Sequence, residues 1–342
     1  MKKTAIVILN WNGKKLLEEF LPSVVRFSSE ATIYVADNAS SDDSVTFIKN
    51  TFPSVKIIQN TDNFGFAKGY NQALRFVEEE YYALVNSDIE VTENWLTPVI
   101  DLFDSEPETA IIQPKILDYK NKQMFEYAGA GGGFIDKYGF PFCRGRIFQT
   151  LEKDRGQYND TIDIFWASGA CFFIRKEIYR NLDGFDEDFF AHQEEIDLCW
   201  RAFNQNLKVK YCGKSTVYHV GGATLKDSNP HKTFLNFRNS LWMMLKNLPK
   251  NKLFPVLFLR LAQDGLAGVK FMTEGKFSHL WAILKAHFYF YLKLFRFLNK
   301  RESKQYDNYY KIKSITYHYF VKKGKVFENK FIRIVIYGIL SL

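Results

Sequence analysis

The sequence predicts an α/β fold, in which a doubly wound, mostly parallel sheet is followed by a mainly α-helical C-terminal region. The first 120 residues alternate short apolar runs with amphipathic stretches, which is typical of βαβ units. Charge divides the chain: residues 241–342 carry 19 Lys or Arg and 5 Asp or Glu, whereas residues 1–240 carry 27 and 33. We therefore expect two domains with different tasks, residues 1–240 and residues 241–342.

The alternation in the first part predicts four strands and four helices in turn. Aliphatic runs predict the strands Ala5–Leu9, Thr32–Ala36, Val55–Ile58 and Tyr82–Val85. Apolar positions at helical spacing predict the helices Lys14–Phe27, Ser41–Asn50, Ala67–Glu79 and Asn94–Asp104. Turn formers and acidic residues precede the second helix and supply its N-cap, and two prolines bracket the fourth helix.

The segment from Gly129 to about Gly156 is rich in glycine and irregular. It is not a phosphate-binding fingerprint, because no Lys-Ser/Thr pair follows it and no strand–turn–helix frame surrounds it. A mobile loop that shapes the substrate site and a plain surface excursion both explain it. Order returns at Ile162–Arg175, which is typical of one or two buried strands, and a further helix begins at Glu194.

The cysteines and the N-terminus indicate a protein that faces the cytosol. The four cysteines show no CxxC spacing and no metal pattern, so we expect them to be reduced and mostly buried. The first apolar run is only five residues long before it meets Asn10, which favours a strand over a signal peptide. The net charge of +8 is concentrated in an aromatic-rich C-terminal part, which argues against a nucleic acid partner.

The basic and aromatic C-terminal region contains two long apolar segments. Leu253–Met272 is interrupted by Arg260, Asp264 and Lys270, which argues against a membrane span. In the second segment, His279–Lys300, four cations lie within an arc of about 80° on a helix, and aromatic and aliphatic residues fill most of the remainder.

The four cations of the second segment are Lys285, Lys293, Arg296 and Lys300. A basic stripe beside a broad aromatic face predicts a helix that lies in the interface of an anionic membrane. The alternative is a cationic helix that packs on the first domain or in a dimer.

The most informative short segment is Asn86-Ser87-Asp88, which follows the strand Tyr82–Val85. Open α/β sheets bind their ligands at the carboxyl ends of the strands. A carboxylate at this position is a suitable ligand for a hard divalent cation. Strands also end in Asn or Asp because these residues form turns, so the segment alone does not decide between the two interpretations.

Three earlier segments place polar residues where a nucleotide-using enzyme needs them. Asn10 follows the first strand, and Asp37 ends the second, where its carboxylate can accept hydrogen bonds from a base or a ribose. The third segment, residues 63–71, has glycines that let the backbone approach a ligand closely. Its candidate contacts are Asn63, Gly65, Lys68 and Asn71.

Two later segments supply candidate acid–base and metal groups. Glu194, Glu195 and Asp197 lie in the first turn of the expected helix, where the helix N-terminus stabilises carboxylates. Crowding of like charges raises the pKa of a carboxylate and suits one of them to act as a general base. His219, which precedes paired glycines, is a candidate imidazole ligand to a metal, and Arg238 is able to meet a phosphate bidentately.

In this order and at these intervals, the segments closely resemble glycosyltransferase family 2, the inverting enzymes with a GT-A fold. The resemblance covers roughly residues 1–240 and is nearest to the rhamnosyltransferase-like branch of bacterial surface-polysaccharide enzymes. It implies that Asn10, Asp37 and the loop 63–71 surround the nucleotide of the donor. It also assigns donor contacts to three further residues, Asn86, Trp166 and Arg238.

The resemblance further implies a metal site and a catalytic base. Asp88 corresponds to the last acidic residue of the DxD motif and, with His219, would bind Mg²⁺ or Mn²⁺. Asn86 stands in place of the first Asp of that motif. The catalytic Glu-Asp-x-Asp motif falls on residues 194–197 and assigns the base to Glu195, where Asp is usual. Since Glu195 is one methylene longer, Glu194 and Asp197 also remain candidates.

The implied reaction is a single displacement that moves a sugar from a dTDP- or UDP-sugar to a hydroxyl of a glycan. The acceptor would be a polyprenyl-linked glycan of cell-envelope polysaccharide synthesis, at the cytoplasmic face of the inner membrane, with the enzyme bound peripherally. Two alternatives stay open: a non-catalytic scaffold that binds nucleotide sugars at the membrane surface, and a nucleotidyltransferase. The latter needs a triphosphate loop, for which residues 10–15 are a poor substitute.

Overall fold

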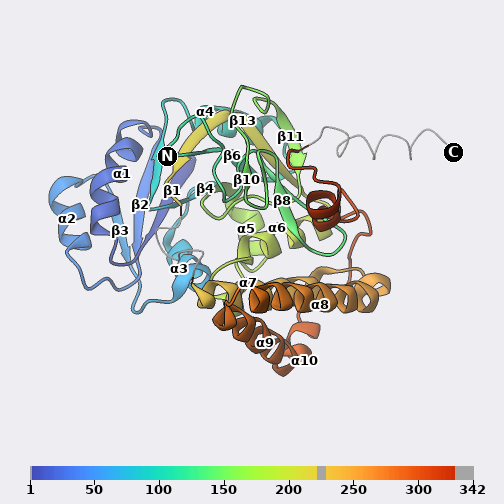
Figure 1. Ribbon diagram of the computed structural model, residues 1–342. Coiled ribbons are helices and arrows are strands. Elements are labelled where there is room, and N and C mark those ends of the chain that lie inside the picture. Colours follow the sequence, from blue (N-terminus) through green and yellow to red (C-terminus); the bar gives the residue numbers. More distant parts are fainter. Residues whose placement is uncertain (1, 222–228, 328–342) are drawn as a thin grey trace.

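The computed structural model describes residues 2–221 and 229–327, and its centre is a mixed nine-stranded sheet (Figure 1). The strands of this sheet are β1 (Thr4–Asn10), β2 (Ala31–Asp37), β3 (Lys56–Gln59), β4 (Tyr81–Asn86), β5 (Ile89–Val91), β6 (Thr109–Asp118), β11 (Thr161–Ile164), β12 (Cys171–Arg175) and β13 (Lys208–His219). Their order is β11-β13-β6-β12-β4-β1-β2-β3, and β5 pairs with β13.

Most strands of the sheet run in one direction. β1 pairs in parallel with β2 and β4, β2 with β3, and β6 with β13. β12 runs antiparallel between β4 and β6, so β6 and β13 share the direction of β4. The predicted doubly wound, mostly parallel α/β fold is confirmed.

Each face of the sheet carries its own apolar core, because successive residues of a strand point to opposite sides. In β1, Ile6 and Ile8 belong to one buried cluster, and Ala5 and Val7 belong to the other. The helices of the first part are α1 (Lys14–Arg26), α2 (Ser44–Thr51), α3 (Gly65–Ala73), α4 (Thr97–Ser105), α5 (Lys176–Asn181) and α6 (Glu194–Asn204).

The helix expected over Ala67–Glu79 is shorter than predicted. It ends at Ala73 and continues as a single 3₁₀ turn to Phe76. Val77 then adopts extended backbone, and its carbonyl accepts a hydrogen bond from the hydroxyl of Tyr82 at 2.8 Å. A tertiary contact thus replaces the last helical turn.

The segment Gly129–Gly156 is neither a mobile loop nor a surface excursion. It forms a four-stranded antiparallel sheet of β7 (Gly133–Ile135), β8 (Pro141–Cys143), β9 (Arg146–Ile147) and β10 (Thr150–Leu151). Phe134 and Phe142 of this sheet are buried in the same core as one face of the main sheet. Strands of two or three residues are too short to show the alternation that identifies a strand in a sequence.

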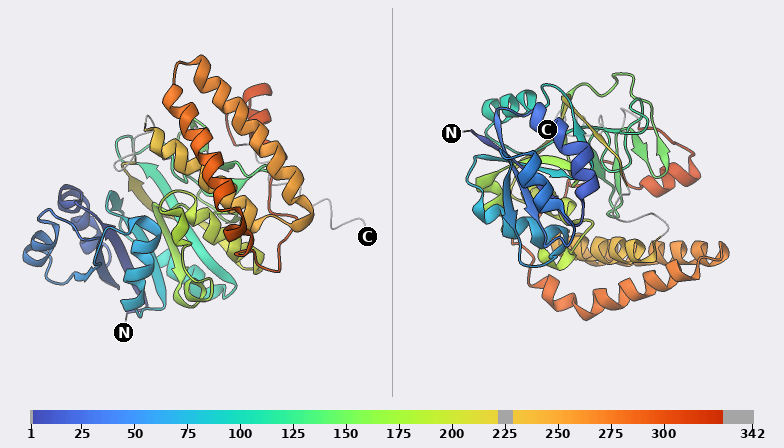
Figure 2. Two further views of the ribbon diagram at one scale, coloured as in Figure 1. Left: turned by 90° about the horizontal axis from the view of Figure 1, so that it is seen from below. Right: turned by 90° about the vertical axis from the view of Figure 1, so that its left-hand side faces the viewer.

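The C-terminal part is helical, as predicted, and consists of α7 (Pro230–Asn247), α8 (Lys250–Thr273), α9 (Phe277–Leu292) and α10 (Leu294–Leu298). The predicted domain boundary at residue 240 falls inside α7, and residues 328–342 lie outside the described part. Figures 1 and 2 show α8 and α9 as one layer beneath the sheet. Among the described residues, no helix has the length and apolar character that a membrane crossing requires.

The basic stripe predicted on His279–Lys300 does not face outward as a unit. Lys293 Nζ lies 3.2 Å from Asp188 Oδ1, and Arg296 Nε lies 2.7 Å from Asp188 Oδ2. Lys300 Nζ contacts Asp186 at 2.5 Å and Asp188 at 2.7 Å. For these three cations the alternative interpretation, packing on the first domain, is correct, because buried carboxylates there require cationic partners.

Candidate functional site

The polar residues predicted from strand ends gather at one edge of the main sheet. The register of the parallel strands pairs Asn10 with Asp37 and Leu9 with Asn86, so three strands end side by side. β13 runs in the same direction and ends at the same edge with His219. This carboxyl edge is the position at which open α/β sheets bind ligands.

Asp37 is held rigidly at this edge. Its Oδ1 accepts hydrogen bonds from Asn10 Nδ2 at 3.0 Å and from Ser40 Oγ at 2.6 Å, and its Oδ2 accepts from the Ser40 N–H at 3.0 Å. A Cβ at Gly13 would lie 2.4 Å from Asn10 Oδ1. The loop after β1 can therefore pass this close to the Asn10 side chain only because residue 13 is glycine. Asn10 thus positions Asp37, and Asp37 presents a fixed carboxylate.

The loop before α3 is built around Gly65. This residue has a φ of +71°, and a Cβ there would lie 2.6 Å from the ring of Phe190. Its N–H donates to Asn63 Oδ1 at 3.1 Å. Lys68 is partly exposed, and its ammonium lies 4.3 Å from the ring centre of Phe64. Asn63 therefore shapes the loop, and Lys68 presents a positive charge beside it.

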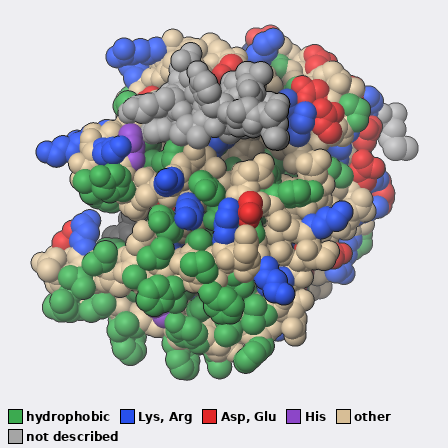
Figure 3. All heavy atoms as spheres, turned by 90° about the vertical axis from the view of Figure 1, so that its right-hand side faces the viewer, with side chains coloured by type: hydrophobic (Ala, Val, Ile, Leu, Met, Phe, Trp, Pro, Cys, Tyr) green, Lys and Arg blue, Asp and Glu red, His purple; other side chains and the backbone are tan. Residues whose placement is uncertain are grey.

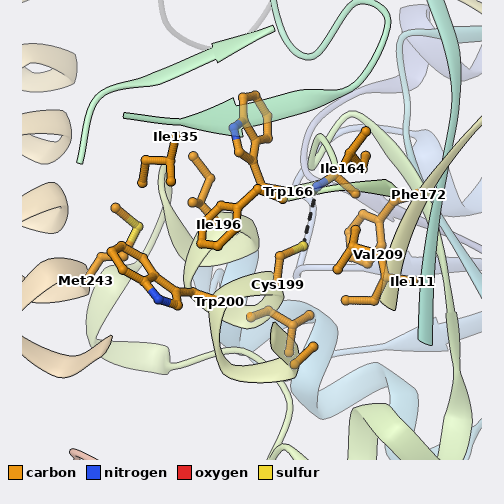
Figure 4. Close-up of a cluster of buried hydrophobic side chains, with 14 of the residues drawn as sticks. Ile111, Ile135, Ile164, Trp166, Phe172, Ile196, Cys199, Trp200, Val209 and Met243 are labelled. Atoms are coloured by element: carbon orange, nitrogen blue, oxygen red, sulfur yellow. Dashed lines mark hydrogen bonds between the residues drawn. The ribbon is translucent and has the colours of Figure 1, made fainter. Parts of the chain in front are cut away.

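Two residues predicted to contact the donor have other partners. Asn71 accepts hydrogen bonds from the Tyr179 hydroxyl at 2.6 Å and the Phe185 N–H at 3.0 Å, and it donates to the Phe185 carbonyl at 2.8 Å. Trp166 lies in the buried core of Figure 4, and its Nε1 donates to the carbonyl of Phe134 at 2.9 Å. These contacts argue against a donor role for Asn71 and Trp166.

Asp88 and His219, the predicted metal ligands, lie in direct contact. His219 Nε2 is 3.2 Å from Asp88 Oδ1, and both side chains are almost fully buried. Two ligands at right angles, each about 2.1 Å from one ion, are about 3 Å apart, so the spacing fits a shared Mg²⁺ or Mn²⁺. Within residues 2–221 and 229–327 there is no group of three or more His, Cys, Asp or Glu that would hold a metal by itself. The pair therefore leaves positions for ligand and water oxygens.

Glu126 is a third member of this cluster that the sequence did not reveal. Its Oε2 lies 3.3 Å from His219 Nδ1, on the opposite side of the imidazole from Asp88. Burial lowers the pKa of His219, but the two carboxylates outweigh it and raise this pKa to about 10. A carboxylate on the far nitrogen orients a metal-binding histidine. Glu126 follows no strand-end pattern, so only the folded chain identifies it.

The three acidic residues at the start of α6 have different environments. Asp197 is fully buried, and its Oδ2 contacts Arg201 Nε at 2.8 Å and Lys246 Nζ at 2.9 Å, while its Oδ1 accepts from Asn247 Nδ2 at 2.7 Å. Burial raises the pKa of Asp197, but Lys246 and Arg201 outweigh it and lower this pKa below the usual value. With both oxygens engaged, Asp197 is suited to hold the structure rather than to take a proton.

Glu194 and Glu195 each have a buried Oε2 without a hydrogen-bond partner among the described residues. Burial raises the pKa of Glu195 to about 7, and burial together with the charge of Glu195 raises the pKa of Glu194 well above its usual value. Glu195 is partly exposed, whereas Glu194 is only 4% exposed. Of the two side chains, that of Glu195 is the more exposed.

Glu195 lies against the residues that precede β12. A Cβ at Gly169 would lie 3.7 Å from Glu195 Cδ. The next residue, Ala170, accepts a hydrogen bond from the N–H of Asn86 at 2.9 Å. Glu195 is thus connected through Gly169 and Ala170 to Asn86, which precedes Asp88 by two residues.

Arg238, the predicted phosphate contact, faces the loop that precedes α6. Its Nη2 donates to the carbonyl of Phe189 at 3.2 Å, and its guanidinium carbon lies 4.3 Å from the ring centre of Trp242. Burial lowers the pKa of Arg238 to about 10. The guanidinium is partly committed to these contacts, so a phosphate contact stays a prediction.

Comparison with known proteins agrees with this geometry. Residues 5–183 match the family described as "Glycosyl transferase family 2". The low-salt glycan biosynthesis hexosyltransferase Agl10 of Haloferax volcanii is 22% identical over 69% of this chain and 73% of its own length. An N-acetylglucosaminyl-diphospho-decaprenol L-rhamnosyltransferase of Mycobacterium tuberculosis is 21% identical over 69% of this chain and 85% of its own length.

Two solved structures share the fold. GalNAc-T7, crystallised with UDP, GalNAc and Mn²⁺, has a TM-score of 0.56 and 15% identity, over 74% of this chain and about half (49%) of its own chain. The mannosyltransferase PcManGT from Pyrobaculum calidifontis, in complex with GDP-Man and Mn²⁺, has a TM-score of 0.53 and 13% identity. The match covers 86% of this chain and 87% of the PcManGT chain. Both structures hold a nucleotide or nucleotide sugar together with Mn²⁺ on this fold.

Proposed function

The chain belongs to glycosyltransferase family 2, and we propose that it transfers a sugar to a glycan hydroxyl by a single inverting displacement assisted by a divalent cation. One observation carries this proposal. Glu195, whose pKa burial raises to about 7, lies against Gly169, whose neighbour Ala170 pairs with Asn86 at the end of β4. Asp88 follows Asn86 by two residues and contacts His219 at 3.2 Å. An inverting, metal-assisted transfer from a nucleoside diphosphate sugar requires two groups, a general base and a site for the cation.

The side chains at this edge have separate tasks in the reaction. Asp37, fixed by Asn10 and Ser40, accepts hydrogen bonds from the nucleoside. Glu195 takes the proton of the acceptor hydroxyl. The hydroxyl oxygen then bonds to the anomeric carbon as the bond from that carbon to the diphosphate oxygen breaks on the opposite face.

Asp88 and His219 would hold the cation, with Glu126 orienting the imidazole. When bound, the cation supplies positive charge to the diphosphate leaving group. Lys68, partly exposed on α3, adds a further positive charge on the donor side. Asn86 contributes its neutral amide at the end of β4, where the family usually has a charge.

The acceptor that we propose is a polyprenyl-linked glycan, and the donor a dTDP- or UDP-sugar such as dTDP-rhamnose. The mycobacterial relative is a rhamnosyltransferase whose name gives a decaprenol-linked diphosphate sugar as its acceptor. The identity of 21% makes this a proposal for the present chain. Such an acceptor would place the reaction at the cytoplasmic face of the inner membrane, in cell-envelope polysaccharide synthesis.

An exposed apolar face on α8–α10 supports this location. We call it the docking face; its members are Phe254, Phe258, Leu266, Val269, Phe277, Trp281, Leu284, Phe288, Leu292 and Phe295. Their spacing of three or four residues, or a multiple of it, keeps them on one side of each helix. Figure 3 shows hydrophobic side chains gathered on the lower part of the molecule, where these helices lie. A contiguous apolar patch of this kind marks an interaction surface.

Exposed lysines accompany the docking face: Lys250, Lys270, Lys276 and Lys285. Each lysine near an anionic bilayer contributes about 1 kcal/mol of attraction. Aromatic rings beside lysines are typical of helices that lie in a lipid interface. We therefore propose that α8 and α9 bind the enzyme peripherally to an anionic membrane.

Thermal unfolding with nucleotide sugars tests the proposed function. We expect one donor from a panel of dTDP-, UDP- and GDP-sugars to raise the Tm when Mn²⁺ is present, because a ligand that binds the native state stabilises it. The variant Asp88→Ala should lose this shift and keep its own Tm within a few degrees. The same donor should then yield a glycosylated product with a lipid-linked acceptor.

A panel in which no donor changes the Tm with Mn²⁺ would contradict the proposal. Donor binding without hydrolysis or transfer would instead favour the non-catalytic scaffold. Among the residues that the structure describes, the buried Oε2 of Glu195 has no hydrogen-bond partner, which favours an enzyme over that scaffold. No observation at the site favours a nucleotidyltransferase.

A further inference from the structure

The loop between α5 and α6 has a strained backbone where it leads into the proposed base. Phe190, His192 and Gln193 have φ values of 66°, 69° and 72°. Residues other than glycine rarely occupy this left-handed region, so neighbouring contacts must hold them there. Glu194 and Glu195 follow directly, which means that the loop sets the direction in which α6 begins.

One buried amide on α7 holds this loop. Asn239 Nδ2 donates to the carbonyls of Phe189 at 3.0 Å, Ala191 at 2.9 Å and His192 at 2.7 Å. The side chain of Asn239 is fully buried, and its Oδ1 accepts from Arg238 Nε at 2.9 Å. An aspartate in its place would turn an oxygen toward three carbonyl oxygens, so the position requires the amide donor.

The opposite side of the loop contacts the donor-binding segment. The carbonyl of Phe190 accepts hydrogen bonds from the N–H groups of Phe66 at 3.0 Å and Ala67 at 3.3 Å. The ring of Phe190 packs against Gly65. The loop held by Asn239 therefore lies between the first turn of α3 and the first turn of α6.

We propose that Asn239 is a positioning residue for sugar transfer: it holds the loop 189–193 in its left-handed conformation and thereby directs Glu195 toward the acceptor hydroxyl. This inference rests on the proposed function of Glu195. The side chain of Asn239 is fully buried, so it acts through the backbone of the loop that it holds.

The attachment of α7 to α6 does not depend on Asn239. Seven residues farther along α7, Lys246 contacts Asp186 and Asp197, each at 2.9 Å, and Asn247 donates to Asp197 at 2.7 Å. Loss of Asn239 therefore leaves the helix docked while it releases the loop. A variant of Asn239 can therefore change the loop without undocking α7, so the effect on the loop can be measured by itself.

Arg175 provides a matched control. It is a buried side chain that also holds three carbonyls, those of Thr109 at 2.8 Å, Phe103 at 2.6 Å and Glu106 at 3.3 Å. It ends β12 opposite the start of β4, at the far edge of the sheet from the proposed site. The two side chains thus hold similar loops, but only one of these loops leads to Glu195.

The experiment compares Asn239→Ala and Arg175→Ala with the full chain in Mn²⁺, a stabilising donor and an acceptor. We expect Asn239→Ala to lower kcat about 10- to 100-fold, the cost of a small misplacement of a reacting group, with donor KM within about threefold. Its pH profile should shift to lower pH because a released loop admits water to Glu195. Arg175→Ala should lower the Tm and leave kcat and the pH profile unchanged.

The pH readout depends on few groups. Glu194 and Cys199 on α6 interact electrostatically with Glu195, and Gly169 and Phe66, which pack near it from the neighbouring segments, do not titrate. Equal kcat and equal pH profiles in the two variants would overturn the positioning role.

A second variant keeps the proposal testable if Asn239→Ala does not fold. Asn239→Ala combined with Gln193→Gly removes one strained residue, and the same loss of kcat is expected, because glycine relieves the strain without directing the loop. Normal kcat in this double variant would overturn the inference. Failure of the proposed function gives a different result, since Glu195→Gln would then transfer sugar as well as the wild type.

Discussion

The carboxyl edge of the main sheet and the docking face of α8–α10 depart from the usual burial of side chains in opposite ways. At the sheet edge, carboxylate oxygens of Glu194 and Glu195 are buried without a hydrogen-bond partner among the described residues. On the docking face, Phe258 and Trp281 are 72% and 69% exposed. Buried polar groups normally have partners, and large apolar patches are normally covered. Under the proposed function, each region would be completed by a ligand of matching chemistry: the sheet edge by a hydroxyl and a cation, and the docking face by a lipid surface.

Where the two regions meet, charges are paired. Lys293, Arg296 and Lys300, which lie in and beside α10, contact Asp186 and Asp188 in the loop before α6. The cations of the C-terminal helices are thus divided: some anchor the helices on the first domain, and others stay exposed beside the docking face. Ion pairs thus join the two regions, whereas the groups that lack a protein partner among the described residues take no part in this junction.

The largest expected effect tests the sheet edge alone. Glu195→Gln should lower kcat about 10²- to 10⁴-fold, because the amide cannot take the acceptor proton. Its Tm should not fall, since the carboxylate has a buried oxygen without a partner among the described residues. Measured kcat values for sugar transfer check this, and vesicle binding should be unchanged.

Asp197→Asn is the control for this prediction. It breaks contacts with Lys246 and Arg201, so it should lower the Tm. Transfer by Glu195→Gln at a rate near that of the wild type would show that Glu195 is not the base. Loss of transfer in Glu194→Gln alone would move the assignment to that residue.

The strand-end residues could be predicted because their placement depends on local pattern and topology. Asn10, Asp37, Asp88 and His219 follow apolar runs, and parallel strands bring such ends to one edge. Neither the alternation of apolar runs nor this rule requires knowledge of distant contacts. The fold class, and the gathering of these residues at one edge of the sheet, therefore follow from the sequence.

Contacts between residues far apart in the sequence could not be predicted from it. The contacts of Asn71 with Tyr179, of His219 with Glu126, and of Lys300 with Asp188 join segments roughly 100 residues apart. The helical period of His279–Lys300 placed its cations on one side but did not say what that side faces. The spacing of residues in a sequence shows which side chains share one face of a helix. Only the folded structure shows which residues that face contacts.

The second prediction tests the docking face alone. Replacing Phe254, Trp281 and Phe288 by Ser should lower partitioning onto anionic vesicles at least about 100-fold, because each buried aromatic side chain contributes about 1.5–3 kcal/mol. Flotation of the full chain measures this. The kcat with a water-soluble acceptor should be unchanged, since these side chains are exposed and lie on α8 and α9.

Phe76→Ser is the matched control for the docking face. Phe76 is 69% exposed but lies in the 3₁₀ turn after α3, away from α8–α10. It should leave vesicle binding as it is in the wild type. Equal partitioning of the triple variant and this control would remove the membrane from the proposal and leave a protein partner as the occupant of the face.

The smallest effect is a pH dependence that reports the environment of Glu195 directly. A general base must be ionised, and burial raises the pKa of Glu195 to about 7. Measured kcat/KM should therefore be constant above pH 7 and fall about tenfold for each pH unit below it. A carboxylate with the ordinary pKa of Glu would keep the rate nearly constant down to about pH 5.

Saturating Mn²⁺, checked by titration at each pH, is required because protonation of His219 competes with metal binding. A midpoint near 4.5 would mean that water reaches Glu195 freely. The carboxyl edge of the sheet would then not be a water-poor environment, and its contrast with the exposed docking face would be lost.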